Sequence, residues 1–267
     1  MADKKNKATR RSIRKQRWAA VIAVLIAVGM LLSSVLIYFD FAAGDNQTPE
    51  QGWDLEDYLE YVRDNITTLE QYLQEHEPTV AVLESLAENY NSLVLLQQML
   101  AGDEQEITEI KNKLVGVYQD LIELAPAEPR YRVDLIRAYT GLEADDQTIL
   151  AEALLLSEML RATPQAAAHM QLINLLAAEE LEIQLQEEVT WLSAYLEQRI
   201  EEEQADNTER YYLAFLLAEH LDDIEAAHIQ LELILETEEE GSSLYNEVKR
   251  YRDALAAEDE LPGGAVE

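Results

Sequence analysis

The sequence predicts an all-α protein in which an N-terminal transmembrane helix precedes an α-solenoid, a stack of paired helices. Three observations support this fold class. Residues 18–39 form an apolar stretch without a charge, apolar residues recur at helical spacing from residue 54 to residue 257, and no segment alternates as a strand would. The charge also changes sign across the apolar stretch, from basic before it to acidic after it.

The stretch 18–39 is long enough to cross a bilayer, because a helix of this length extends about 33 Å. Trp18 and Tyr38 stand near its two ends, where amphipathic rings favour the headgroups. Residues 1–17 hold eight Lys and Arg against one Asp, so we expect a basic cytoplasmic tail. A cleaved signal peptide is the alternative, but its apolar part is usually shorter and is followed by small residues. We therefore expect a single-pass anchor in the cell membrane, with the C-terminal domain outside the cytoplasm.

Two short segments follow the anchor. Residues 40–53 contain Gly, Pro, Asn and Asp without periodicity, which indicates a linker. Residues 54–75 are expected to form an amphipathic juxtamembrane helix, whose apolar residues alternate at steps of four and three. We favour packing against the next helix pair over a coiled-coil dimer, because this seam covers fewer than three heptads. These apolar residues are Leu55, Leu59, Val62, Ile66, Leu69 and Leu73.

Residues 76–257 are predicted to form a helical repeat domain, because paired helical segments recur with breaks at Pro, Gly or Asp between them. The segments are 79–100, 104–124, 129–139, 147–161, 165–179, 181–203, 208–220, 222–237 and 243–257. The acidic residues 258–267, which include Leu-Pro-Gly-Gly, are expected to be a disordered tail.

The repeat pattern resembles the tetratricopeptide (TPR) family. Its motif places Leu-small-x-x-Tyr in the first helix, a small residue in the second and Pro at the end. The residues that match this motif, and that the resemblance expects to pack inside the repeats, are Leu86, Ala87, Tyr90, Pro126, Leu135, Tyr139, Leu213, Ala214 and Ala226. The resemblance covers residues 79–238 and implies stacked TPR-like helical hairpins that bind peptides or protein surfaces on their concave face.

The acidic charge excludes whole classes of partner. Beyond residue 17 the chain holds 12 basic and 52 acidic residues, a net charge of −40, so it repels phosphate backbones and no nucleic acid is expected to bind. The absence of cysteine removes disulfides, thiolate catalysis and cysteine-ligated metal sites.

No catalytic or cofactor site is predicted. The nine glycines form neither a dinucleotide fingerprint nor a P-loop, and the histidines lack the paired spacing of a zinc site. His220 beside Asp222 and Asp223 could hold a metal, but a polar helix end is the better interpretation. Runs of Glu such as 201–203 are typical of solvated helix faces, where nothing raises a carboxyl pKa for acid catalysis. We therefore expect a protein without catalytic residues, cofactor or metal, and not an enzyme.

The leading functional hypothesis is a membrane-anchored scaffold or adaptor outside the cytoplasm that binds proteins, in secretion or envelope assembly. A basic or extended segment is the expected partner, and the bilayer is contacted through residues 18–39. Tyr211, Tyr212 and Trp191 are the candidate partner-binding anchors, because aromatic residues concentrate binding energy. The alternative is a structural protein whose repeat domains assemble into a homo-oligomer or filament.

Overall fold

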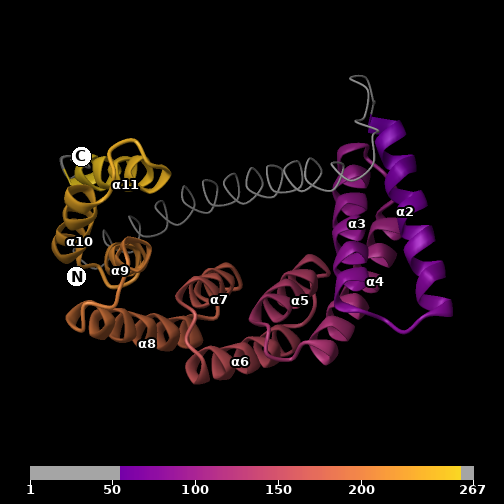
Figure 1. The fold of residues 1–267 in the computed structure, drawn as a ribbon, viewed down its shortest axis with the longest axis horizontal. Helices are drawn as coiled ribbons and strands as arrows, with labels where there is room; N and C mark the ends of the chain where they lie inside the picture. The colour runs from indigo at the N-terminus through magenta and orange to yellow at the C-terminus, as the bar shows by residue number, and fades with distance from the viewer. Residues whose placement is uncertain (1–54, 260–267) are drawn as a thin grey trace, which may run out of the picture. The chain divides into compact units, whose positions relative to one another are not determined.

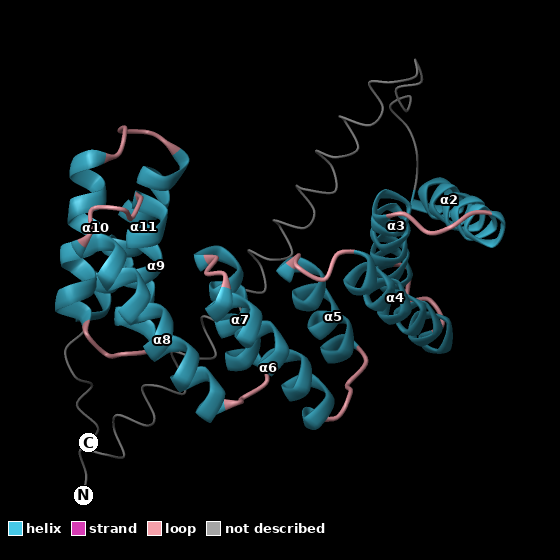
Figure 2. Cartoon of the chain, turned by 60° about the horizontal axis from the view of Figure 1, so that its bottom comes forward, coloured by secondary structure: helices cyan, strands magenta, loops and turns pink. Residues whose placement is uncertain are grey.

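The computed structural model describes residues 55–259, which form ten α-helices joined by loops, with no strand among them (Figures 1 and 2). The helices are α2 Leu55–Glu75, α3 Val80–Met99, α4 Glu104–Leu124, α5 Pro129–Gly141, α6 Asp146–Ala162, α7 Ala166–Ala178, α8 Glu182–Glu201, α9 Asn207–Glu219, α10 Ile224–Thr237 and α11 Ser243–Asp259. They form an all-helical, repeat-like bundle that is compatible with a helical solenoid.

The predicted fold class, a transmembrane helix followed by a solenoid of TPR-like hairpins, was wrong as stated. No helix within residues 55–259 is both long enough and apolar enough to cross a membrane. The physical reason is that nine of these helices carry carboxylates, and α7, which carries none, has only 13 residues. The predicted transmembrane segment 18–39 lies outside the described residues.

The other predicted N-terminal segments, 1–17 and 40–53, also lie outside the described residues, as do residues 260–267 of the predicted tail. A boundary between two compact units falls between Asp64 and Asn65, within α2. The helical repeat described below belongs entirely to the second unit.

Aspartate and threonine caps start several of the helices. The Asp206 side chain accepts a hydrogen bond from the Glu209 backbone amide at 2.8 Å, and the Glu209 carboxylate accepts one from the Asp206 amide in return. Asp103, Asp145 and Thr79 each accept backbone hydrogen bonds at the helix that follows them. Each cap satisfies amides that the first turn of a helix leaves without an intrahelical partner. All ten helices begin and end within two residues of the segments expected from the sequence.

The helices pack in consecutive pairs, as Figure 1 lets the reader follow from α3 to α11. The strongest contacts join α3 to α4, α9 to α10, α4 to α5, α5 to α6 and α7 to α8. The first helices of successive pairs also contact one another, α5 with α7 and α7 with α9, whereas α6, α8 and α10 make no comparable contacts among themselves. In each pair, this arrangement leaves one long face of the second helix exposed.

Aliphatic side chains fill the space between α5, α6 and α7. The buried members of this cluster are Val133, Ile136, Ile149, Ala153, Leu156, Leu160, Leu172 and Leu176. Because α6 contributes four of them, it packs between the first helix of its own pair and the first helix of the next. This shared core fixes the position of α7, on which the site below depends.

Candidate functional site

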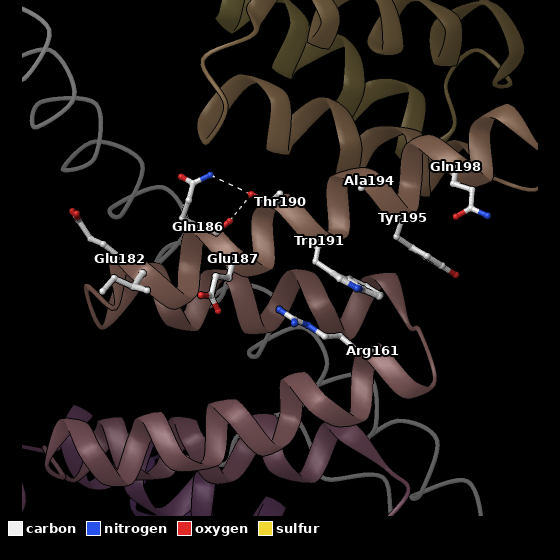
Figure 3. Close-up of a pocket in the computed structure, with 10 residues that line it drawn as sticks. Arg161, Glu182, Gln186, Glu187, Thr190, Trp191, Ala194, Tyr195 and Gln198 are labelled. Atoms are coloured by element: carbon white, nitrogen blue, oxygen red, sulfur yellow. Dashed lines mark hydrogen bonds between the residues drawn. The ribbon is translucent and has the colours of Figure 1, made fainter.

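A groove runs along the exposed face of α8 (Figure 3). Its volume is about 1050 Å³. Nine of its lining residues come from α8, at helical spacing, and Arg161 comes from the end of α6. The lining residues are Arg161, Glu182, Ile183, Gln186, Glu187, Thr190, Trp191, Ala194, Tyr195 and Gln198.

Two aromatic rings form the apolar part of this groove. Trp191 and Tyr195 lie one helical turn apart, with ring centroids 5.4 Å apart and an interplanar angle of 9°. Figure 3 shows both side chains projecting to the same side of α8. Both are half-buried, so each packs against the protein and still offers surface to the groove. Trp and Tyr are the residues that most often dominate protein interfaces.

A buried histidine stacks against the Trp191 ring. His169, in the first turn of α7, is fully buried and stacks on Trp191 with centroids 4.7 Å apart and an interplanar angle of 15°. The stacked ring restricts the orientation of Trp191, because an indole that packs against a fixed plane has few alternative rotamers.

Glu188 holds this histidine from the other side. It is buried, and its Oε2 atom lies 2.5 Å from His169 Nε2. Its Oε1 atom accepts hydrogen bonds from Ser157 Oγ at 2.7 Å and from Arg161 Nη2 at 2.6 Å. A buried carboxylate needs such partners, since an unpaired charge in the interior is costly.

The electrostatics of Glu188 follow from these contacts. Burial by itself would raise the pKa of Glu188. The hydrogen bonds from His169 and Ser157, and the charges of His169 and Arg161, outweigh burial and hold the pKa of Glu188 below its ordinary value. Glu188 is therefore a carboxylate at neutral pH.

This cluster contains the residue types of a nucleophilic triad but not their arrangement. Here the carboxylate of Glu188 lies between Ser157 and His169, whereas a catalytic histidine lies between the nucleophile and the carboxylate. All three side chains are also buried, so no substrate reaches the Ser157 hydroxyl in this conformation. The cluster therefore holds α6, α7 and α8 in place relative to one another and fixes the orientation of the Trp191 ring.

Two arginines lie over the aromatic pair. The Arg161 guanidinium carbon lies 6.0 Å from the Trp191 ring centroid, and that of Arg199 lies 5.8 Å from the Tyr195 centroid. Arg199 also pairs with Glu209 at 2.9 Å, which anchors it toward α9. These cation–π contacts and the histidine stack make the aromatic pair a preorganised surface.

Of the predicted partner-binding residues, Trp191 lines the groove, whereas Tyr211 and Tyr212 lie on α9. Tyr211 is half-buried, contacts Tyr251 edge-on at 5.9 Å, and donates a hydrogen bond to Glu247 at 3.2 Å. Burial and the neighbouring Glu247 raise its pKa. Tyr212 is also half-buried, and burial raises its pKa as well. Neither tyrosine is among the residues that line the groove.

The residues of the TPR-like motif differ in how deeply they are buried. Six of them are buried, namely Leu86, Ala87, Tyr90, Leu135, Leu213 and Ala214. Tyr139 is half-buried, and its hydroxyl accepts a hydrogen bond from Gln119 at 3.0 Å.

Two expected packing positions need correction. Pro126 is exposed, because it lies in the turn after α4 and not within a packed helix. Ala226 is only half-buried, since the phase of α10 turns Ala227 fully inward in its place.

Sequence reasoning missed Ser157, His169, Glu188 and Tyr195. A signal existed for Glu188, because it lies four and eight residues before Leu192 and Leu196, on the buried stripe of α8. A carboxylate on an apolar stripe indicates a buried partner. The described residues contain no group of three or more acidic or His side chains placed to hold a metal ion, and His220 instead contacts Phe215 edge-on at 6.0 Å.

Neither a protein-family model nor a curated protein matches this sequence.

Proposed function

We propose that residues 76–257 form a TPR-like helical-repeat scaffold that binds another protein, with the α8 groove as a binding site. The observation that carries this proposal is the parallel Trp191–Tyr195 pair at the surface. Large aromatic rings, neighbouring arginine and a polar rim are the composition of interface hot spots. Because His169 and Glu188 hold the pair in place before binding, little side-chain freedom is lost when a partner docks.

The expected partner is a basic or extended protein segment. Glu182 and Glu187 lie at one end of the groove, where they attract a cationic side chain, while the aromatic rings contact apolar atoms of the partner. The net charge of −40 beyond residue 17 favours such a partner over an acidic one and disfavours nucleic acid.

The location is proposed from the sequence alone. The basic residues 1–17 and the apolar residues 18–39 suggest attachment to the cell membrane, with the N-terminus in the cytoplasm and the acidic helices outside. A scaffold placed there would serve secretion or envelope assembly. Protease added to intact cells should then digest the acidic helices, and protection of those helices would contradict this location.

The experiment that tests the scaffold function places a photo-crosslinking amino acid at Gln198, which is exposed in the groove. The matched control position is Glu158, exposed on α6 outside the groove. We expect crosslinks to a discrete protein from Gln198 and not from Glu158. Trp191→Ala should weaken binding of that protein by at least about 30-fold, the cost of losing a hot-spot residue of about 2 kcal/mol.

Two outcomes would contradict the proposal. Equal crosslinking from both positions would mean that the groove does not bind a partner in preference to the rest of the surface. Unchanged binding by a folded Trp191→Ala variant, verified by its thermal melt, would remove the aromatic pair as the anchor. Capture of a second copy of the chain through Gln198 would instead favour the alternative function of self-assembly.

A further inference from the structure

A second groove lies on α10, separate from the one on α8. Its volume is about 730 Å³, and all of its lining residues belong to α10. They are Ile224, Glu225, His228, Ile229, Glu232, Leu233 and Glu236, which recur at alternating steps of one and three residues. One long exposed face of this helix therefore forms the whole groove.

This face carries a stripe of apolar side chains although it points away from the core. Ile229 is 55% exposed and Leu233 is 38% exposed, one helical turn apart. The opposite face of α10 already buries Ala227, Leu231 and Ile234. A surface helix normally carries a single apolar stripe, so a second stripe is available for a helix that is not part of this core.

The charges along the groove have one sign. All three charged residues that line it are glutamates, Glu225, Glu232 and Glu236, spaced by seven and four residues on the same side of α10. Arg252 of α11 reaches Glu232 with a nitrogen–oxygen distance of 3.1 Å. The chain itself therefore shows that a guanidinium from an adjacent helix fits a carboxylate at this groove.

These features favour one class of partner for the groove over the others. Negative lipid headgroups and phosphate backbones are repelled by the row of glutamates. A second copy would bring an identical row of glutamates to a two-fold contact, because such an interface pairs the same surface with itself. A basic helix with its own apolar stripe satisfies both the glutamates and the exposed aliphatic side chains.

We propose that the α10 groove binds an amphipathic helix of a partner protein, with apolar side chains on Ile229 and Leu233 and Lys or Arg beside the glutamates. The inference belongs to the proposed scaffold function but does not depend on the α8 groove. Each groove is tested by its own variants, so one proposal can fail while the other stands.

The test uses a fluorescent synthetic peptide of Leu and Lys, about four helical turns long, with the leucines spaced for one helical face. Its affinity is measured for the full chain and for Ile229→Ser and Leu233→Ser. The matched control is Leu154→Ser on α6, at a residue that is 52% exposed and lines neither groove. None of these substitutions alters the net charge, so a general attraction between basic peptide and acidic protein is unaffected by them.

We expect Kd to rise at least about tenfold in Ile229→Ser and in Leu233→Ser, as for loss of an interface anchor. It should stay within about twofold of the native value in Leu154→Ser. Glu232→Gln combined with Glu236→Gln should slow association and reduce its salt dependence. The same peptide with Glu in place of Lys should not bind.

Three results would overturn the inference. Equal weakening by Ile229→Ser and Leu154→Ser would show that the peptide attaches to the surface in general. Undiminished binding in a folded Ile229→Ser variant would exclude the apolar stripe. Self-association of the full chain that Ile229→Ser abolishes would make a second copy the occupant.

Discussion

At the scale of single residues, Glu188 joins three helices through one carboxylate. Its partners Ser157 and Arg161 lie on α6, and His169 lies on α7. Hydrogen bonds of this kind are directional, so they fix the relative rotation of the helices more sharply than aliphatic packing does. The orientation of Trp191 at the surface therefore depends on a residue that is itself buried.

Glu188→Gln should lower the free energy of unfolding by about 3 kcal/mol at pH 7, because it leaves charged and polar partners without a buried carboxylate. The control is the neighbouring Glu187→Gln, an exposed residue whose change should stay within about 0.5 kcal/mol. Chemical denaturation of both variants measures the difference. Equal costs would show that the buried network contributes no more than a solvated carboxylate.

The same variant has a defined dependence on pH. Because the pKa of Glu188 is lower in the folded protein than its usual value near 4.5, its stabilising effect is complete above that value. The effect is lost as the pH falls through the folded pKa. The stability difference between the native protein and Glu188→Gln should thus be constant near neutral pH and shrink below about 4.5. A difference that grows on acidification would contradict the pairing.

At the scale of helices, five helix ends of the described residues adopt a left-handed turn without glycine. The residues in this conformation have φ between 52° and 60° and are Ala101, Glu143, Glu180, Glu203 and Asp222. After α5, the Ala144 amide donates to the Tyr139 carbonyl at 3.1 Å and the Glu143 amide to the Thr140 carbonyl at 3.0 Å. This is the hydrogen-bond pattern of a Schellman motif, in which glycine is the favoured residue. Each non-glycine residue there holds a conformation that its Cβ atom disfavours.

Glu143→Gly should therefore raise the free energy of unfolding by about 0.5–1 kcal/mol, because glycine adopts this conformation without strain. Glu143→Ala is the matched control, since it removes the same charge but keeps the Cβ atom, and it should change stability by less than about 0.5 kcal/mol. Thermal unfolding of the two variants provides the measurement. If alanine stabilised as much as glycine, charge at the helix end would be the cause instead.

The helix ends could be predicted from the sequence because the signals are local. Pro129 at the start of α5 and aspartate caps such as Asp145 identify ends within a few residues of the chain. The grooves could not be predicted, because they depend on which face of α8 or α10 remains uncovered after neighbouring helices pack. The Glu188 network joins residues up to 31 positions apart, so no local pattern pairs them.

At the scale of the whole molecule, repulsion between carboxylates destabilises the folded state. The chain holds 53 Asp and Glu against 20 Lys and Arg, so most carboxylates have no cation of their own. Pairs such as Arg132 with Glu152, at 2.6 Å, balance the charge only locally. The remaining carboxylates repel one another over distances set by ionic strength, and compaction on folding brings them closer.

Salt should therefore stabilise the protein. Between about 10 and 150 mM salt the Debye length falls from about 30 to 8 Å, which screens repulsion between carboxylates on successive helices while leaving buried contacts such as that of Glu188 intact. We expect the melting temperature to rise by about 3–6 °C, equivalent to about 1–2 kcal/mol. Choline chloride should match sodium chloride at equal ionic strength, because screening does not depend on the identity of the cation. A flat curve would mean that the carboxylates are already balanced in the folded state, and a response to sodium alone would point to bound cations rather than screening.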